Sequence, residues 1–406
     1  MRTICLITNG HISSDPRIVK EADTLQETGY RTIVIGTQYM PDLIKYDELL
    51  VQSRPWIYEK LIWTKEDAPI LYLKTRLRHY FFRILPSFLW PSLGIAEKAL
   101  GRLTPELIKK ASLVKADLYI AHNLAALPVA AKVARKYNAK LGFDAEDFHS
   151  GESLADDKAV KLAEFIEKKY LNQCDYITAA SEFIAQAYAE RYKIKEPTTV
   201  LNVFPLSMIQ DMPRQDNPGL LLYWFSQNIG IGRGIEDVIM AMGRTKQTVR
   251  LYLQGRINPR YKTKLVRLAL KNKVGQDRLI FLEISSQDDL FKIASRFDVG
   301  LALEKKEPLS KHFCIPNKIL TYLLAGLSVI ATDTKGQRSV IERIGRAGWM
   351  YKNGDIDSLV KRLEFLLENK QELDISKQES LKQAREIYNW DLERNKFLNI
   401  INEVLS

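Results

Sequence analysis

The amino-acid sequence predicts an α/β protein with two Rossmann-like domains, each built on a parallel β-sheet covered by helices. Short apolar runs alternate with amphipathic stretches along most of the chain, which is typical of successive strand–helix units. The alternation pauses in the proline-rich, polar stretch "PLSMIQDMPRQDNPG" and then restarts. A chain of 406 residues is also long enough for two domains of ordinary size.

The first half begins with the apolar run "TICLIT", which we expect to be a buried strand. A helix should follow in "SDPRIVKEADTLQETG", because Asp15 can cap its amino end, Pro16 fits its first position and Gly29 can end it. Later strands of this half are expected in "YRTIVIGT", "ADLYIAHN", "AKLGFDAEDFH", "CDYITAAS" and "TTVLNVF". Those of the second half are expected in "LLLYWFS", "VRLYLQG", "RLIFLE", "FDVGLALE" and "LSVIATD".

The composition and the termini argue against several classes of protein. With 46% hydrophobic and 27% charged residues, the chain has the composition of a soluble globular protein. Cys5, Cys174 and Cys314 lie far apart, so we expect free thiols rather than disulfides or a zinc site. The apolar run near Met1 is too short for a signal peptide, and no apolar stretch reaches the length of a membrane span. We therefore expect a cytoplasmic protein.

Much of the net charge of +11 comes from residues 70–115, where nine lysines and arginines face two acids. The segment is also rich in aromatic residues, as in "ILYLKTRLRHYFFRILPSFLWPSL". Interleaved rings and cations suit an anionic membrane surface, which is the interpretation we prefer. Two others stay open: a pair of core helices with solvated charged faces, and a nucleic-acid site. We expect no nucleic acid, because no stacking or groove-reading motif accompanies the charge.

Ligands of parallel α/β sheets bind beyond the carboxyl ends of the strands, so the polar residues there are the candidate site. Glycines in "GIGRG" (residues 230–234) can let the backbone approach a ligand, and a helix follows that directs free N–H groups to the same place. Arg233 adds a cation whose geometry suits phosphate. A diphosphate site and a tight structural turn both remain open. The spacing matches neither the dinucleotide fingerprint nor the NTP-binding loop.

Four motifs in order give the sequence its resemblance to a known family. "SDPRIVKEADTLQETGY", "GRGIEDVI", "PNKILTYLLAGLSVIATD" and a terminal helix resemble retaining glycosyltransferases of the GT-B fold, in particular the group four bacterial sugar transferases. The similarity runs from Met1 to about Asp357, and the terminal "WDLERNKFLNIINEVLS" resembles the closing helix of such folds. The resemblance implies an acceptor domain at 1–205, a nucleotide-sugar donor domain at 206–385, with the two facing a cleft, and a closing helix at 386–406 that crosses back.

The resemblance also assigns roles to individual residues. His122 matches a histidine that contacts the donor sugar, and Arg233 and Lys318 match positions near the donor diphosphate, so these three are the expected catalytic residues. The expected donor-binding residues are Gly10, Gln227, Gly232, Arg233, Arg256, Glu304, Asn317, Lys318 and Thr321. The expected acceptor-binding residues are Asn9, His11, Asp144, Glu146 and Asp147. For the three carboxylates, a capping and salt-bridge cluster stays open as an alternative.

Two positions depart from the family pattern. Thr321 stands where the family has a ribose-binding glutamate, and Gln227 stands where a second basic residue is common. A hydroxyl lacks the charge-assisted hydrogen bond of a carboxylate, so both changes bear on donor affinity. Glu304 is a candidate substitute for the missing acid.

The implied reaction moves a sugar from a nucleotide-diphosphate sugar to a glycan or lipid-linked acceptor, in bacterial surface polysaccharide biosynthesis. We expect retention of configuration, no cofactor beyond the nucleotide sugar as co-substrate, and no metal, because cations and helix amino ends can stabilise the leaving diphosphate. The enzyme would be cytoplasmic, or peripheral on the inner face of the cell membrane. Two alternatives remain: a nucleotide-sugar epimerase of the same fold, and a catalytically silent nucleotide-binding module.

Overall fold

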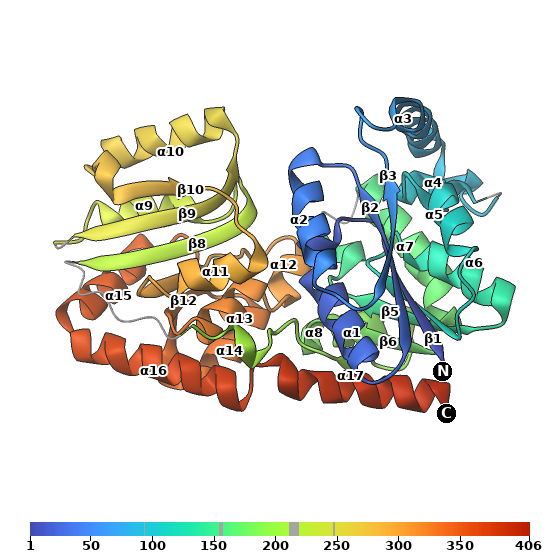
Figure 1. Ribbon diagram of the computed structural model, residues 1–406. Helices are drawn as coiled ribbons and strands as arrows, with labels where there is room; N and C mark the ends of the chain where they lie inside the picture. The colour runs from blue at the N-terminus through green and yellow to red at the C-terminus, as the bar shows by residue number, and fades with distance from the viewer. Residues whose placement is uncertain (93, 154–156, 211–218, 247) are drawn as a thin grey trace. The chain divides into compact units, whose positions relative to one another are not determined.

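The computed structural model describes residues 1–92, 94–153, 157–210, 219–246 and 248–406, which form two compact units (Figure 1). The first unit comprises Met1–Val200 together with Glu393–Ser406, and the second comprises Leu201–Leu392. Each contains one parallel sheet with helices packed on it, so the prediction of two Rossmann-like α/β domains is confirmed. Within the stretch predicted to separate the domains, residues 211–218 lie outside the described residues.

The first unit has a seven-stranded sheet in the order β3-β2-β1-β4-β5-β6-β7, and every neighbouring pair is parallel. Its strands are β1 (Thr3–Thr8), β2 (Arg31–Gln38), β3 (Ile57–Ile62), β4 (Leu118–His122), β5 (Lys140–Ala145), β6 (Tyr176–Ala179) and β7 (Thr198–Thr199). Its helices are α1 (Pro16–Glu27), α2 (Pro41–Gln52), α3 (Pro69–Ile84), α4 (Ile95–Leu100), α5 (Thr104–Ala111), α6 (Leu127–Tyr137), α7 (Lys158–Tyr170), α8 (Glu182–Tyr192) and most of α17 (Trp390–Leu405).

The second unit has a six-stranded parallel sheet in the order β10-β9-β8-β11-β12-β13. Its strands are β8 (Leu220–Ile229), β9 (Val249–Ile257), β10 (Leu279–Leu282), β11 (Val299–Ala302), β12 (Ser328–Thr332) and β13 (Gly348–Tyr351). Its helices are α9 (Ile235–Met242), α10 (Pro259–Lys271), α11 (Gln287–Ala294), α12 (Leu309–Phe313), α13 (Asn317–Leu324), α14 (Lys335–Ile344), α15 (Ile356–Glu368) and α16 (Lys370–Glu386).

Both sheets reverse their strand order at one place. The chain moves outward from β1 through β2 to β3 and then returns to place β4 on the other side of β1. The second unit does the same around β8, with β11 on its other side. Helices leave the carboxyl ends of the two central strands in opposite directions at such a point, which opens a crevice there for a ligand. The residues after β1 and β4, and after β8 and β11, are therefore the first to consider as a site.

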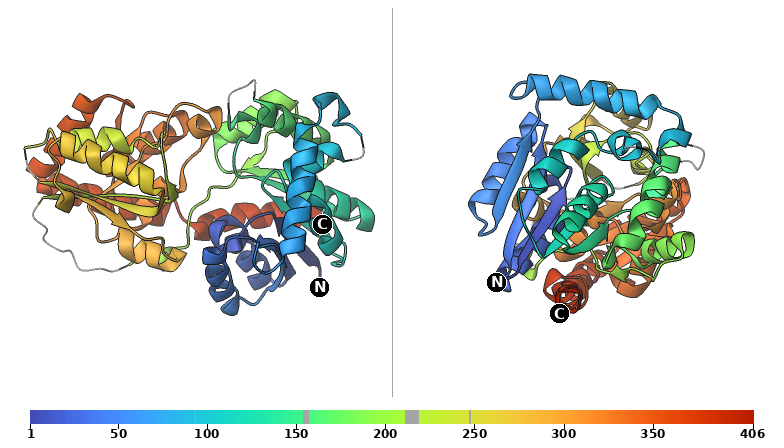
Figure 2. Two further views of the ribbon diagram at one scale, coloured as in Figure 1. Left: turned by 90° about the horizontal axis from the view of Figure 1, so that it is seen from above. Right: turned by 90° about the vertical axis from the view of Figure 1, so that its right-hand side faces the viewer.

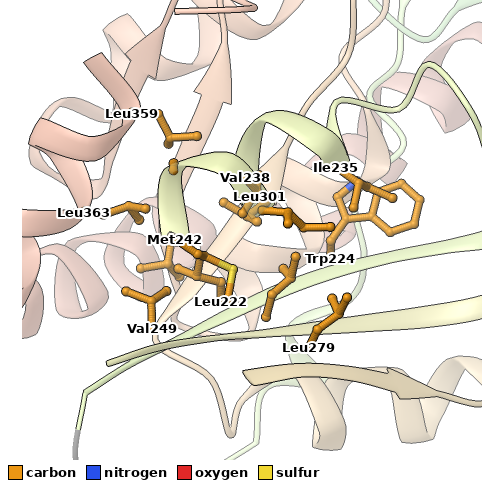
Figure 3. Packing of buried hydrophobic residues seen from close by; sticks show 14 of the residues in the cluster. Leu222, Trp224, Ile235, Val238, Met242, Val249, Leu279, Leu301, Leu359 and Leu363 are labelled. Carbon is orange, nitrogen blue, oxygen red and sulfur yellow. The ribbon is translucent and has the colours of Figure 1, made fainter. Parts of the chain in front are cut away.

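Helices cover both faces of the second sheet. Contacts join α9 to α10 and α15 on one face and α13 to α16 and α14 to α16 on the other. The core between α9, α15 and the sheet contains Leu222, Trp224, Val238, Leu301 and Leu363, all fully or almost fully buried (Figure 3). Burial of these side chains holds α9 and α15 against the sheet, because each large apolar side chain contributes about 1.5–3 kcal/mol when removed from water.

Local sequence signals set the start of α1 as expected. The Asp15 carboxylate accepts a hydrogen bond from the Ile18 backbone N–H at 3.2 Å, and Pro16 occupies the first helical position. An aspartate in this position satisfies one of the free N–H groups of the first turn. The cap therefore anchors the helix directly after the loop that leaves β1.

Strands β8 and β9 extend further than their apolar runs suggest. Leu220–Ile229 includes Gln227, which was expected to follow the strand, and Val249–Ile257 includes Arg256. The pairing of the two strands is irregular between Phe225 and Asn228. An irregularity of this kind lets a ladder continue past a break in the alternation of apolar and polar residues. Gln227 and Arg256 therefore lie within strands rather than in loops.

Helix α17 belongs largely to the first unit. Arg394 forms an ion pair with Glu27 at 2.7 Å, and Asn402 accepts a hydrogen bond from the Tyr30 hydroxyl at 3.0 Å. Phe397 and Ile401 are buried. The terminal helix predicted to return to the first domain does so.

Replacing Gly300 with alanine should destabilise the second unit. A Cβ at Gly300 would lie 2.1 Å from Cγ of Tyr322, a fully buried ring, so either β11 or α13 must shift. Overpacking of this kind costs about 1–3 kcal/mol. Chemical denaturation of the intact protein measures the loss. Gly230→Ala is the control, because nothing lies within 4 Å of a Cβ there, and equal stability of the two variants would contradict the packing argument.

Candidate functional site

In the second unit, Glu304 brings together two cations from separate segments. It follows the end of β11, and its carboxylate lies 3.2 Å from Nζ of Lys318 and 3.9 Å from Nη1 of Arg233. Lys318 is the second residue of α13, whereas Arg233 lies in the loop between β8 and α9. The Arg233 side chain is 35% exposed and that of Lys318 is 11% exposed. Arg233 is therefore the member of the trio most open to a ligand.

The glycine loop between β8 and α9 takes a shape that other residues would resist. Gly232 and Gly234 have φ angles of 79° and 75°, a left-handed region that glycine adopts without strain. A Cβ at Gly234 would lie 2.8 Å from Cβ of Leu303, so the loop packs closely beside Glu304. At Gly232 the space is open. The loop therefore places Arg233 beside Glu304 and leaves room on its other side.

The cations keep Glu304 ionised. Burial by itself would raise the pKa of this carboxyl, but Lys318, Lys311 and Arg233 lower it to about 2. The Glu304 backbone carbonyl accepts a hydrogen bond from the Thr332 hydroxyl at the end of β12. Lys318 also lies over the Trp224 ring, 5.3 Å from its centroid. Glu304 is thus an ionised carboxylate paired with two cations, which differs from a free carboxylate able to bind a ribose.

The remaining expected donor-binding residues of the second unit lie in α13 or at the ends of β8 and β9. Asn317 begins α13 next to Lys318. Thr321 is one helical turn further on and fully buried, and its hydroxyl is without a hydrogen-bond partner in the described structure. Gln227 and Arg256 lie on the paired ends of β8 and β9, where Arg256 is opposite Asn228. The structure thus brings Arg233, Glu304 and Lys318 together, whereas Gln227 and Arg256 lie on the ends of β8 and β9.

In the first unit, charged side chains form a buried cluster at the carboxyl ends of β4 and β5. His122, at the end of β4, is fully buried. Its Nε2 lies 3.2 Å from Glu21, and its Nδ1 lies 3.3 Å from Glu146 and 3.5 Å from Asp144. Burial alone would lower the pKa of His122, but Glu21, Glu146 and Asp144 raise it well above the usual value. The three carboxylates around the ring therefore favour the charged form of the imidazole.

Arg17 completes this cluster from α1. Its Nε and Nη2 both donate to the Asp144 carboxylate, the second at 2.8 Å, and its Nη1 donates to the Val200 carbonyl at 2.5 Å. Thr178 also donates to Asp144, at 2.7 Å. Asp144 thus has a structural partner on each oxygen, which matches the salt-bridge alternative rather than contact with an acceptor. Glu146 is the member that reaches the surface, with 27% of its side chain exposed.

Arg17 and Glu21 were not among the predicted site residues. Both lie on α1 one turn apart, and Lys20 between them is buried as well. The sequence pattern could have indicated them, because Arg17 and Glu21 share a helical face with the apolar residues Ile18 and Leu25. Charged residues on a face expected to be buried need partners.

The residues after β1 are held by their own unit. The Thr37 hydroxyl donates to the Asn9 carbonyl at 2.7 Å, and the Thr37 N–H donates to the Gly10 carbonyl at 3.0 Å. His11 is buried, with Nδ1 2.6 Å from Asp47 and with Nε2 accepting the backbone N–H groups of Tyr39 and Met40. Both ring nitrogens of His11 are therefore engaged, which leaves neither for an acceptor. Asp147 is partly buried, and its carbonyl accepts from the Tyr188 hydroxyl.

Two groups in the described residues have the composition of a metal site: Glu21, His122 and Asp144, and Asp15, His122 and Glu146. In each group the candidate ligand atoms lie within 4.8 Å of one another. Arg17 already donates to both oxygens of Asp144, so this carboxylate of the first group has a cationic partner within the protein. The second group shares His122 with the first and adds Asp15 and Glu146, which are both partly buried.

Comparison with known proteins gives one match to a family and a shared fold. Residues 227–369 match the protein-family model described as "Glycosyl transferases group 1". Comparison with curated proteins gives no significant match.

Solved structures share the fold over the whole chain. Anabaena HepE in complex with UDP-glucose is 14% identical with a TM-score of 0.74, covering 99% of this chain and 100% of its own. Sucrose-phosphate synthase from Thermosynechococcus elongatus is 14% identical with a TM-score of 0.72, covering 100% and 99%. S. aureus TarM, solved with fondaparinux, alpha-GlcNAc-glycerol and UDP, is 11% identical with a TM-score of 0.70, covering 99% and 100%. The chain therefore has the GT-B fold.

Replacing Arg17 with alanine should destabilise the first unit strongly. The substitution leaves the buried Asp144 carboxylate without its bidentate partner, and breaking a buried pair in this way costs about 3–5 kcal/mol. Urea denaturation of the intact protein measures the loss. Arg244→Ala is the matched control, because the pair of Arg244 with Asp357 is 52% and 71% exposed and should contribute at most about 1 kcal/mol. Similar losses in both variants would show that Arg17 does not anchor Asp144.

Glu304→Gln should remove a stabilisation that depends on pH. A carboxyl whose pKa falls from 4.5 to about 2 on folding stabilises the folded state above pH 4.5, and this contribution is lost as the pH falls towards 2. At neutral pH the variant should be less stable by roughly 3 kcal/mol, since each pKa unit corresponds to about 1.4 kcal/mol. Denaturation at a series of pH values should show the gap closing in acid. Glu372→Gln, which affects an exposed pair with Arg346, should show no such gap.

Proposed function

We propose that this chain is a glycosyltransferase that moves a sugar from a nucleotide-diphosphate sugar to a glycan or lipid-linked acceptor. The proposal extends to a hexosyltransferase that acts in bacterial surface polysaccharide biosynthesis, in the cytoplasm. The observation that carries it is the placement of Arg233 and Lys318 on one buried carboxylate at the end of β11, beside a glycine loop. Two cations and an open loop at the crossover point of a parallel sheet suit a diphosphate.

Sugar transfer requires positively charged groups beside the phosphate that leaves. Cleavage of the bond between the anomeric carbon and the diphosphate oxygen places negative charge on the nucleotide that leaves. Arg233 would bind that charge through its forked N–H groups, and Lys318 would add a second positive charge. Because Glu304 fixes both side chains before the donor arrives, the site stabilises the transition state without reorganising. The reaction as we propose it retains configuration and uses no metal or further cofactor.

The acceptor side of the proposal rests on Glu146. It is the partly exposed member of the cluster in the first unit, and Nδ1 of His122 lies 3.3 Å from its carboxylate. We therefore assign Glu146, with Asp147 beside it, to contact with acceptor hydroxyls. His122 is fully buried, so we assign it to positioning Glu146 rather than to contact with the sugar.

Known proteins support the donor class. Residues 227–369, which match the group 1 glycosyl transferases, contain Arg233, Glu304 and Lys318. A protein of the same fold has been solved with UDP-glucose, and another with UDP and saccharides. A second function, nucleotide binding without turnover, is favoured by Thr321, whose uncharged and buried hydroxyl stands where the resemblance places a ribose-binding glutamate.

Arg233→Ala should abolish stabilisation of the protein by its donor nucleotide. Thermal unfolding is followed with UDP, GDP, dTDP, ADP and CMP, and a ligand at about 100 times its Kd should add roughly 2.7 kcal/mol to the stability of the wild type. In a transfer assay with the matching nucleotide sugar, the variant should lose about 100-fold in kcat/KM.

The control for this experiment is Arg267→Ala, an exposed cation on α10 far from β11 in the strand order. It should behave as the wild type in both measurements. Nucleotide binding that persists in Arg233→Ala would contradict the proposed phosphate site. Binding by the wild type without transfer to any glycan acceptor would support the silent binding module, and conversion of the donor sugar without an acceptor would indicate an epimerase.

A further inference from the structure

Helix α3 exposes an apolar stripe that none of the described residues of the first unit covers. Seven of the eighteen exposed large hydrophobic residues in the described chain lie between residues 70 and 88. The stripe consists of Ile70, Leu73, Leu77, Tyr80, Phe81 and Ile84 on α3, with Phe88 just beyond it, and these side chains are 54–83% exposed. At 100° per residue, the six on α3 fall within an arc of roughly 100°. One continuous face of the helix is therefore apolar and solvent-facing.

The opposite face of α3 is fixed to its own unit. Arg78 forms an ion pair with Glu106 at 2.5 Å, and His79 hydrogen-bonds the Lys98 carbonyl at 3.1 Å. Arg102 donates to the Thr75 hydroxyl at 3.0 Å and stacks on Tyr72, 4.5 Å from the ring centroid. These contacts join α3 to the segment that includes α4 and α5, and α3 (light blue) lies on the outside of the first unit (Figure 2). The apolar stripe is therefore held outward.

Cations flank the stripe on both sides. Lys74 lies at one edge of the arc, and Arg76 and Arg83 lie at the other. All three are exposed and form no ion pair with the described residues. Helix α3 contains no acidic residue. Leucine, isoleucine and aromatic side chains with cations on both sides have the arrangement of a helix that lies in a membrane interface, with rings among the acyl chains and cations at anionic headgroups.

We propose that the exposed stripe of α3 docks the protein on an anionic lipid bilayer. Two α3 stripes facing each other would bring their unpaired cations together, so a second copy of the chain is a poorer occupant. Docking would be parallel to the surface, because none of the described helices has the length and apolarity to cross a bilayer. The inference goes beyond sugar transfer and does not depend on it, since it concerns α3 alone.

The test is sedimentation of the full-length protein with vesicles of phosphatidylcholine alone or mixed with phosphatidylglycerol. The wild type should bind the anionic vesicles, and salt should weaken that binding. Leu77→Ser with Phe81→Ser should lower the partition coefficient by about tenfold or more, since two buried apolar side chains are lost. Lys74→Gln with Arg76→Gln and Arg83→Gln should reduce binding to anionic vesicles to the level seen with phosphatidylcholine.

Matched substitutions on other helices serve as controls. Leu270→Ser with Phe365→Ser removes one exposed leucine and one exposed phenylalanine, and Lys264→Gln with Arg267→Gln and Lys271→Gln removes three exposed cations of α10. Both should bind vesicles as the wild type does, and all variants should keep the wild-type melting temperature. The proposal is overturned if the wild type ignores anionic vesicles, if the control variants lose as much binding as the α3 variants, or if the α3 variants instead abolish a dimer seen in gel filtration.

Discussion

A carboxylate removed from water must be matched by a cation, and each unit of this protein is arranged around one such match. In the first unit Arg17 of α1 binds both oxygens of Asp144 at the end of β5. In the second unit Lys318 of α13 binds Glu304 just after β11. Because an unpaired buried charge costs several kcal/mol, each pair fixes a helix against the carboxyl end of its sheet. That is the edge where α/β proteins bind ligands.

The two charged clusters expose groups of opposite charge to solvent. In the cluster of the first unit the buried His122 is surrounded by carboxylates, and Glu146 is partly exposed. The second unit keeps a surplus of positive charge, because one carboxylate holds two cations and Arg233 remains partly exposed. The first edge therefore suits hydroxyl groups, and the second suits an anion. On this division we base the proposal that the acceptor binds the first unit and the nucleotide sugar the second.

The surface of α3 differs from both charged clusters because its exposed side chains are mainly apolar. Arg78, His79 and Thr75 on its inward face make the polar contacts that join it to the unit. The exposed leucines and aromatic rings on the other face do not contribute to that attachment. Apolar surface of this extent is seldom left to water unless it meets a partner. A bilayer would account both for the exposed stripe and for the unpaired cations that border it, and it would hold the protein where lipid-linked saccharides are found.

The sequence by itself determined the two parallel sheets, the cap at Asp15 and the glycine loop before α9, because these depend on apolar periodicity and on residues next to each other in the chain. Only the tertiary structure decided which charges meet. Arg17 and Asp144 are 127 positions apart, and nothing local in the sequence pairs them. The sequence likewise suggested Glu304 as a candidate ribose-binding carboxylate, whereas in the fold it pairs with Arg233 and Lys318. Ionic partners are set by where strands end and helices return, and a one-dimensional pattern contains no such distances.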